Sequence, residues 1–261
     1  MADTNRNMPS GGLNKLSLNE GSYIDKVIAV VSGKGGVGKS TVTALLAVAL
    51  AKEGYKVGIM DADLTGASIP YLFGLEDLLK VSENGLEPAK TTLGIKVVSI
   101  ALAMENPETA VIWRGPLLSR ALQQFWTDVN WGELDYLLID MPPGTSDVPL
   151  TVMQMLPLDG VVVVTSPQDM ARSVVKKAYH MANQMNIPVL GVVENMSYAV
   201  CPHCGEKFYV FGQKPLSDTA EEFGVKASAE LPIDQNVAKL TDEGKIEEAD
   251  TSPLNPLLET L

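Results

Sequence analysis

The sequence predicts an α/β fold built on a doubly wound, mostly parallel sheet. Short apolar runs rich in Val and Ile recur along the chain, and they do not alternate with polar residues, as is typical of buried parallel strands. Helical segments lie between these runs, so right-handed strand–helix–strand connections are expected. The expected strands are residues 27–31, 56–60, 95–100, 136–139, 160–165 and 189–193, and the expected helices are residues 40–53, 115–129 and 171–185.

The length of 261 residues fits one large domain or two small ones. Residues 1–22 are rich in Asn, Ser and Gly without periodicity, which is typical of a flexible tail. The strand pattern starts directly after this tail, so residues 23–261 are expected to form a single domain. Residues 250–261 contain two prolines and are expected to form a turn or short helix that packs back on the body.

The composition excludes several classes of protein. With 20 Lys and Arg against 32 Asp and Glu, the net charge is −12, which argues against a nonspecific binder of nucleic acid or of an anionic membrane. No apolar run reaches the roughly 18 residues of a membrane helix, and the N-terminus lacks the apolar core of a secretory signal. Two cysteines do not make a disulfide framework, so a reducing cytoplasm is the expected compartment.

The strongest local signal is a glycine-rich loop that fits the phosphate-loop pattern G-x-x-x-x-G-K-[ST]. It follows an apolar strand and opens a helix, so backbone N–H groups and the helix N-terminus converge on phosphate oxygens. Lys39 is expected to reach the β- and γ-phosphates of a nucleotide, and Ser40 to bind Mg²⁺. The expected nucleotide-binding residues of this loop are Gly33, Lys34, Gly35, Gly36, Val37, Gly38, Lys39, Ser40 and Thr41.

Two acidic residues come directly after expected strands or close to their ends, where an open α/β sheet has its ligand crevice. Asp63 is placed to orient an attacking water. Asp140 is a Walker-B-like acid that is expected to bind Mg²⁺ through water. Gly144, in the loop after Asp140, is expected to turn its backbone toward the γ-phosphate, so that the loop reports hydrolysis. Alternatively each acid caps a helix or is solvated, and Asp147 is as readily an ordinary loop acid.

Lys34 goes beyond the standard loop pattern, because it lies five residues before Lys39. The resulting K-G-G-x-x-K-[ST] resembles the deviant Walker A signature of the family that includes nitrogenase iron protein, the septum-site and chromosome-partitioning ATPases and the arsenite-pump ATPase. The resemblance implies a P-loop NTPase of the SIMIBI type and a homodimer in which Lys34 reaches the partner's nucleotide. It implies catalytic roles for Lys34, Lys39 and Asp63. The alternative is that Lys34 is a solvated surface charge.

The base-recognition site is less marked. The Asn-Lys-x-Asp sequence of GTPases is absent. In the deviant Walker A family, positions that match Asn195 and Pro232 contact adenine, so the resemblance implies ATP as the nucleotide. Asn195 alternatively caps a turn.

Cys201 and Cys204 form a C-x-x-C pair and are the only cysteines of the chain. Two thiolates at this spacing converge on one metal ion or cluster, and two chains related by a two-fold axis supply the four ligands of a complete site. Four thiolates suit either Zn²⁺ or an iron–sulfur cluster. A redox pair and two inert cysteines are the remaining interpretations. His203, between the two thiols, is expected to face solvent.

Four segments together, residues 33–41, 61–63, 140–144 and 194–204, resemble the Mrp/ApbC/Nbp group of iron–sulfur carrier ATPases. The resemblance implies a homodimer that binds a labile [4Fe–4S] cluster through Cys201 and Cys204, with ATP-dependent transfer to apo iron–sulfur proteins. We expect slow ATP hydrolysis, since the motifs include no arginine finger. The alternatives are a positioning ATPase, for which the chain offers no basic stripe and no use for the cysteines, and an ATPase whose dimer is stapled by zinc.

Overall fold

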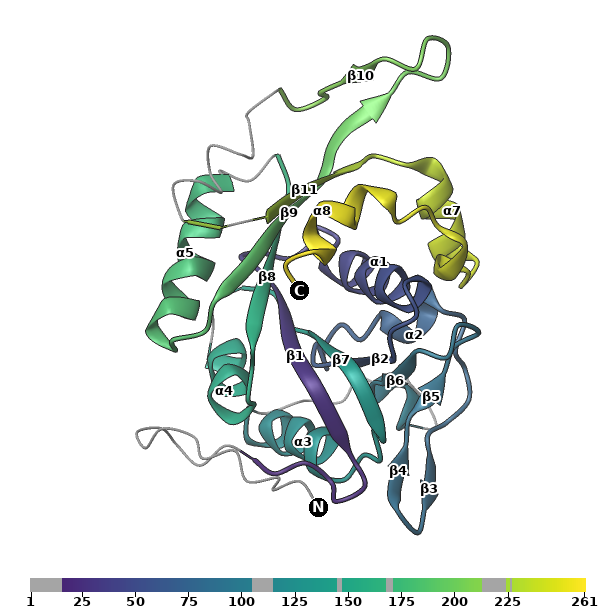
Figure 1. Cartoon of the computed structure of the whole chain (residues 1–261), viewed down its shortest axis with the longest axis vertical. Helices are drawn as coiled ribbons and strands as arrows, with labels where there is room; N and C mark the ends of the chain where they lie inside the picture. Colours follow the sequence, from purple (N-terminus) through teal and green to yellow (C-terminus); the bar gives the residue numbers. More distant parts are fainter. Residues whose placement is uncertain (1–15, 105–114, 145–146, 168–170, 213–223, 226) are drawn as a thin grey trace.

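The computed structural model describes residues 16–104, 115–144, 147–167, 171–212, 224–225 and 227–261. Within these ranges a mostly parallel sheet forms the centre of the molecule, with helices on both faces (Figure 1). Its strands are β1 (Tyr23–Ser32), β2 (Val57–Asp61), β5 (Ala89–Lys90), β6 (Lys96–Val98), β7 (Glu133–Asp140), β8 (Gly160–Thr165), β9 (Val189–Val200), β10 (Lys207–Phe208) and β11 (Ala227–Pro232). A separate hairpin is formed by β3 (Lys80–Ser82) and β4 (Gly85–Glu87).

The strand order in this sheet is β10-β9-β8-β1-β7-β2-β6-β5, and β11 also pairs with β9. The sheet is parallel except at its two ends, where β5 and β10 run antiparallel to β6 and β9. The parallel strands are β1, β2, β6, β7, β8, β9 and β11. The strand order reverses at β1. The earlier strands β2, β6 and β5 lie on one side of β1, and the later strands β8, β9 and β10 lie on the other. The carboxyl ends of β1, β2 and β7 therefore meet at one edge, where a crevice for a ligand is expected.

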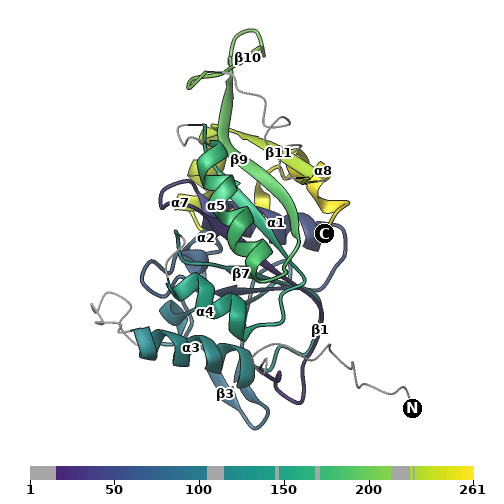
Figure 2. The ribbon, with the colours of Figure 1, turned by 90° about the vertical axis from the view of Figure 1, so that its left-hand side faces the viewer.

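Each face of the sheet has its own hydrophobic core. Val27 and Ala29 of β1 belong to one core and Ile28 and Val30 to the other, because successive side chains of a strand point to opposite faces. Figures 1 and 2 show α3, α4 and α5 over one face and α1, α7 and α8 over the other. The helices are α1 (Lys39–Lys52), α2 (Ile69–Leu72), α3 (Gly115–Thr127), α4 (Asp147–Met155), α5 (Ala171–Gln184), α7 (Gln235–Asp242) and α8 (Asn255–Leu258), with 3₁₀ turns η1 (Ile100–Leu102), η2 (Ile246–Glu248) and η3 (Ser252–Leu254).

The predicted fold class is confirmed, and each expected strand and helix has a counterpart. Several boundaries differ: β1 and β7 begin earlier than expected, at Tyr23 and Glu133, and two further differences have a clear structural reason. The run 95–100 was expected to be one strand, but β6 ends at Val98 and Ile100 begins a 3₁₀ turn whose N-cap is Ser99. The run 189–193 continues as β9 to Val200, because β11 and β10 pair with the part beyond residue 193.

Both ends of the described chain pack on the body. Residues 1–15 of the expected tail lie outside the described residues, but Leu16 is anchored: its N–H donates to the Met155 carbonyl at 3.2 Å, and its carbonyl accepts the indole N–H of Trp126 at 3.1 Å. At the other end, the expected short helix is α8, and Leu257 and Leu261 are buried in the core beneath α1. In the part of the chain that the structure covers, no helix has the length and apolar character to cross a membrane.

Candidate functional site

The loop between β1 and α1 is the floor of the candidate nucleotide site. Gly36 and Gly38 have φ angles of 80° and 78°, a left-handed backbone that favours glycine. Gly38 is the N-cap residue of α1, and its carbonyl accepts the N–H of Val42 at 2.9 Å. A Cβ at Gly38 would lie 2.2 Å from Nδ2 of Asn195, so a larger residue does not fit there. The loop thus presents its backbone at the N-terminus of a buried helix, which suits an anion.

An open cavity of about 270 Å³ borders this loop. It brings Lys34, Lys39 and Asp63 together, although Asp63 comes from the segment after β2. Two larger cavities, of about 430 and 520 Å³, contain no residue of the loop, and we place the site at the smaller one because charged groups and glycine backbone converge there. The cavity is lined by Ser32, Lys34, Gly35, Gly36, Val37, Gly38, Lys39, Ser40, Thr41, Asp63, Ser68 and Pro143, and the half-buried Gly33 joins this lining to β1.

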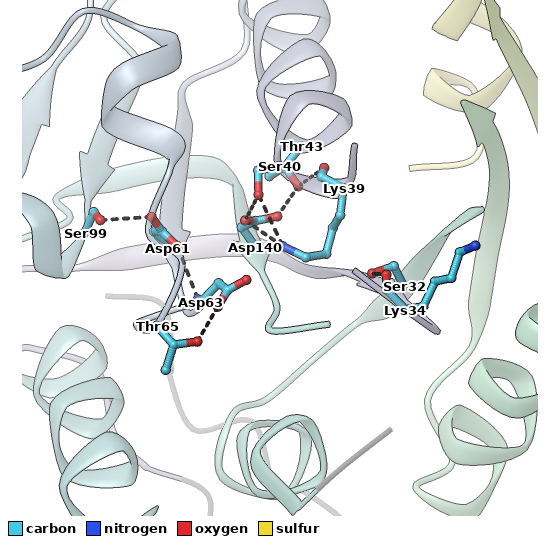
Figure 3. A network of polar contacts seen from close by, with 10 residues as sticks. All are labelled: Ser32, Lys34, Lys39, Ser40, Thr43, Asp61, Asp63, Thr65, Ser99 and Asp140. Atoms are coloured by element: carbon cyan, nitrogen blue, oxygen red, sulfur yellow. Dashed lines mark hydrogen bonds and ion pairs between the residues drawn. The ribbon is translucent and has the colours of Figure 1, made fainter. Parts of the chain in front are cut away.

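Asp140, at the end of β7, is fully buried and lies at the centre of a polar network (Figure 3). Its Oδ2 is 2.7 Å from Nζ of Lys39 and accepts the hydroxyl of Ser40 at 2.6 Å. Its Oδ1 accepts the hydroxyl of Thr43 at 2.7 Å. Thr43 is a functional candidate that the motif pattern did not single out. Its position four residues after Lys39, on the same face of a helix, is the signal that points to it.

Asp61 and Asp63 belong to a second network at the end of β2 (Figure 3). Asp61 is fully buried; its Oδ2 accepts the hydroxyl of Ser99 at 2.9 Å, and its Oδ1 accepts the backbone N–H of Asp63 at 3.2 Å. The hydroxyl of Thr65 donates to Oδ1 of Asp63 at 3.2 Å. Asp63 is 9% exposed and borders the cavity, so it is the carboxylate of this pair that reaches the candidate site.

The pKa of Asp61 is raised to about 8. Burial is the main cause, and the charge of Asp140 on the neighbouring strand raises it further. The Ser99 hydrogen bond and the charge of Lys39 act in the opposite direction. Asp61 therefore holds a proton near neutral pH, whereas Asp140 is paired with Lys39.

This raised pKa predicts how stability depends on pH. A carboxyl whose pKa is higher in the folded than in the unfolded state stabilises the fold at low pH, and the contribution is lost as the pH rises through the folded value. Unfolding of the protein without nucleotide should therefore cost less free energy at pH 8 than at pH 6, by up to about 1.4 kcal/mol per pH unit from this group. Asp61→Asn should remove this decline. Urea unfolding of both proteins at pH 6, 7 and 8 measures it, and parallel profiles would contradict the assignment.

Three further expected residues lie around the loop. Lys34 is exposed on the rim of the cavity. Gly144 has a φ of 91°, and its N–H donates to the carbonyl of Ser32 at 2.9 Å, so its backbone is tied to the end of β1. Pro232 ends β11, opposite Tyr198 in the register of β9. The side chain of Asp147, at the start of α4, lies outside the described residues.

Asn195 makes a direct contact with the phosphate loop. Its Nδ2 donates to the carbonyl of Val37 at 3.0 Å, and its Oδ1 accepts the N–H of Met196 at 3.0 Å. Met196 has a φ of 58°, a conformation that is rare outside glycine. In the pairing with β11, Glu194 and Tyr198 of β9 lie four positions apart, whereas their partners Glu230 and Pro232 lie only two apart. Asn195 and Met196 thus lie in a β-bulge that faces the loop, within a strand rather than in a capped turn.

The two cysteines lie in the turn of the hairpin formed by β9 and β10, which projects from the body in both views (Figures 1 and 2). The N–H of Cys201 donates to the carbonyl of Glu206, and the N–H of Gly205 to the carbonyl of Cys201, both at 2.9 Å. Neither cysteine forms a disulfide; Cys201 is half-buried and Cys204 exposed, as is His203. The turn therefore presents both thiols at an accessible position.

The chemistry of this turn favours a thiolate at Cys201. The backbone N–H groups of Cys204 and His203 and the side chain of Cys204 lower the pKa of the Cys201 thiol. The thiolate is the form that binds metal ions and clusters. The neighbouring surface is apolar, since Val200 and Phe208 are 48% and 51% exposed. Among the described residues, no group of three or more His, Cys, Asp or Glu is arranged to hold a metal ion.

Comparison with known families identifies the chain. A family model described as "ParA: NUBPL iron-transfer P-loop NTPase" matches residues 23–261. The chain belongs to this family. An iron–sulfur cluster carrier protein from Clostridium perfringens is 51% identical over 242 residues, which are 90% of this chain and 84% of that protein.

Solved structures agree with the NUBPL-type assignment. A nucleotide-binding protein from Archaeoglobus fulgidus, determined in complex with ADP, is 50% identical, covers 91% of this chain and 95% of its own, and superposes with a TM-score of 0.81. The cell division ATPase MinD from Pyrococcus furiosus covers 90% of this chain and 98% of its own with a TM-score of 0.62. At 24% identity, MinD shows a common fold only. The predicted P-loop NTPase fold of the deviant Walker A type is thus confirmed.

Proposed function

We propose that this protein is an ATP-dependent carrier that holds a [4Fe–4S] cluster as cargo between two copies of the chain and passes it to apo iron–sulfur proteins. The observation that carries the proposal is a phosphate loop of the deviant type in the same domain as a projecting C-x-x-C turn. The name of the relative from Clostridium perfringens supports it. The proposed ATPase domain is residues 23–261, and the proposed compartment is the cytoplasm, where thiols stay reduced.

The nucleotide side of the proposal rests on the network around Asp140. Ser40 Oγ and Asp140 Oδ2 lie 2.6 Å apart beside the loop, and such oxygen atoms are the ligands that Mg²⁺ prefers, so the donor set fits this ion. Mg²⁺, when bound, neutralises charge on the phosphates. Lys39 is held at the same point and binds the β- and γ-phosphates. Asp63, on the cavity wall, orients the attacking water, and Asn195 and Pro232 contact adenine in this proposal.

The cargo side rests on the number of thiols. Each chain has two cysteines, and a [4Fe–4S] cluster takes four thiolates. A two-fold axis through the cluster brings Cys201 and Cys204 of both copies together. The exposed apolar side chains beside the turn, Val200 and Phe208, are covered in such a dimer. The same four thiolates suit Zn²⁺, so metal analysis has to distinguish the two.

A structural connection between the two sites supports their coupling. The bulge at Asn195 contacts the phosphate loop, and the same strand continues without a break to Val200 and then to Cys201. We propose that loss of the γ-phosphate alters the loop and, through β9, the hold of the thiols on the cluster. Coupling of this kind requires that the nucleotide states differ in their affinity for the cluster.

The test is a metal and sulfide analysis after anaerobic reconstitution with iron and sulfide. About four irons and four acid-labile sulfides per dimer are expected, together with transfer to an apo-ferredoxin that depends on ATP. Zinc is measured in the same sample. Stoichiometric zinc with no retained iron would replace the carrier proposal by that of a zinc-stapled ATPase.

Lys34→Ala tests the dimeric form of the proposed site. If Lys34 contacts the phosphates of the partner's nucleotide, the turnover number of the parent protein rises with protein concentration, and that of the variant stays at the low-concentration value. We expect a loss of about 100-fold in kcat at saturating concentration, as for removal of one donor to a developing charge. Steady-state ATPase assays over a concentration series measure both. An equal kcat in parent and variant would contradict the cross-subunit role.

A further inference from the structure

We propose that Ser99 is a positioning residue for ATP hydrolysis, which acts through the carboxyl of Asp61 on the backbone of Asp63. The inference rests on the proposed hydrolase activity and deepens it. Ser99 lies outside the phosphate loop and outside the acidic motifs. It does not border the cavity that holds Lys39 and Asp63. Ser99 can therefore affect hydrolysis only through the residues that it contacts.

The sheet register places Ser99 beside the acidic end of β2. Met60 pairs with Val98 in the parallel ladder between β2 and β6, so the next residues of the two strands, Asp61 and Ser99, lie side by side. Ser99 is fully buried, and its hydroxyl donates to Oδ2 of Asp61 at 2.9 Å. Figure 3 shows this hydroxyl approaching Asp61 from the side opposite to Asp140. The hydroxyl oxygen also accepts the N–H of Ala101 at 3.3 Å, which directs its proton toward Asp61.

The other oxygen of Asp61 holds the segment that carries Asp63. Oδ1 of Asp61 accepts the N–H of Asp63 at 3.2 Å, and the Asp63 carbonyl in turn accepts the N–H of Gly66 at 3.0 Å. The carboxyl of Asp61 can be oriented by Ser99 and Asp63 only when one oxygen faces each of them. A fixed Ser99 hydroxyl thus sets the rotation of the carboxyl, and the carboxyl sets the position of the Asp63 backbone.

Electrostatics explain why this orientation matters. Asp61 and Asp140 pair in register on adjacent strands, which lie about 4.8 Å apart, and both carboxyls are buried. Asp140 is bound by the Lys39 ammonium and by the hydroxyls of Ser40 and Thr43. The Ser99 hydroxyl reaches Asp61 from the side opposite to Asp140. Without the Ser99 donor, Oδ2 of Asp61 loses the hydroxyl that holds it in place. A carboxyl that rotates away from this position releases the backbone N–H of Asp63.

The experiment is a double-mutant cycle on ATP hydrolysis with Ser99→Ala, Asp61→Asn and the double variant. Ser99→Ala should lower kcat about tenfold and leave the KM for ATP within about twofold, because Ser99 acts on the water-orienting residue. If Ser99 acts through Asp61, the double variant should be no more than about twofold slower than Asp61→Asn alone. Ser99→Thr keeps the hydroxyl and should restore most of the rate. Ser82→Ala, in the exposed hairpin β3–β4, is the matched control and should hydrolyse ATP as the parent does.

A readout of position complements the rates. Hydrogen exchange of the Asp63 amide should be faster in Ser99→Ala than in the parent and should return toward the parent value in Ser99→Thr. An Asp63 amide that exchanges no faster in Ser99→Ala than in the parent would overturn the proposal. If Ser99→Ala is too unstable to measure, equal exchange in Asp61→Asn and the parent would overturn it, because the path runs through Asp61.

The outcomes separate this inference from the proposed function. A parent that hydrolyses ATP together with a Ser99→Ala kcat within twofold of it overturns only the role of Ser99. Single effects that multiply in the double variant overturn the path through Asp61. A parent no faster than Lys39→Ala overturns the hydrolase proposal and the role of Ser99 with it.

Discussion

Replacing Cys201 with Ser is expected to lower the iron and sulfide of the reconstituted dimer from about four each to near zero. The hydroxyl of Ser does not supply the soft, anionic ligand that iron takes from a thiolate, whereas the backbone N–H groups that lower the pKa of the Cys201 thiol favour its anion. Because Cys201 lies in the projecting turn, away from the phosphate loop, the variant should bind ATP as tightly as the parent without its cluster. Iron and sulfide analysis and calorimetric titration with ATP on the same samples measure both.

His203→Ala is the matched control for this experiment. His203 is exposed between the two thiols, and its backbone, which the substitution keeps, contributes the N–H that acts on Cys201. The control should therefore keep iron and sulfide. Full retention of the cluster by Cys201→Ser would exclude the bridging arrangement, and its loss from His203→Ala would show that the imidazole takes part.

Lys39→Ala should reduce ATP hydrolysis by at least about 100-fold, since it removes the cation that faces the phosphates. The same substitution is also expected to destabilise the fold. Lys39 is 6% exposed and its Nζ lies 2.7 Å from the fully buried carboxylate of Asp140, so its removal leaves a buried charge with two hydroxyl donors. We expect the free energy of unfolding to fall by about 3 kcal/mol. ATPase rates and urea unfolding of the same preparation separate the two effects.

Lys56→Ala controls for the loss of a lysine. Lys56 forms an exposed ion pair with Glu133 at 2.9 Å, and such a pair contributes little to stability because water and salt screen it. Both the rate and the unfolding free energy should stay near those of the parent. A Lys39→Ala protein that hydrolyses ATP at the parent rate would remove the phosphate-site assignment.

The parts of the fold that sequence predicts are those in which a local pattern and the tertiary environment agree. The run 160–165 is apolar throughout and forms β8 with those bounds, because a strand buried on both faces needs no alternation. β9 shows the limit. Its second half contains Asn195, Ser197 and Tyr198, and the polar pattern predicts an end at residue 193. The strand continues because β11 and β10 supply partners that are distant in the sequence.

The candidate site likewise contains residues that the sequence predicts and residues that only the fold brings together. The phosphate loop is recognisable because one short segment supplies most of the binding groups. Thr43 and Ser99 carry no motif, and they become functional candidates only when the sheet places them beside Asp140 and Asp61. The contact of Asn195 with the Val37 carbonyl also depends on register, since it joins residues 158 positions apart. Spacing in sequence holds no signal for such pairs.

The bulge in β9 is separated from the cysteine turn by a long extended segment. Cys201 is six residues beyond Asn195, a reach of about 20 Å along an extended strand. A pivot of about 10° at the left-handed Met196 would sweep the thiols through about 3 Å, which is more than the length of a metal–sulfur bond of about 2.3 Å. In a symmetric dimer, the cysteine hairpins of both copies would move together. If the two sites are coupled as proposed, a small adjustment of the phosphate loop would thus produce a larger displacement at the thiols.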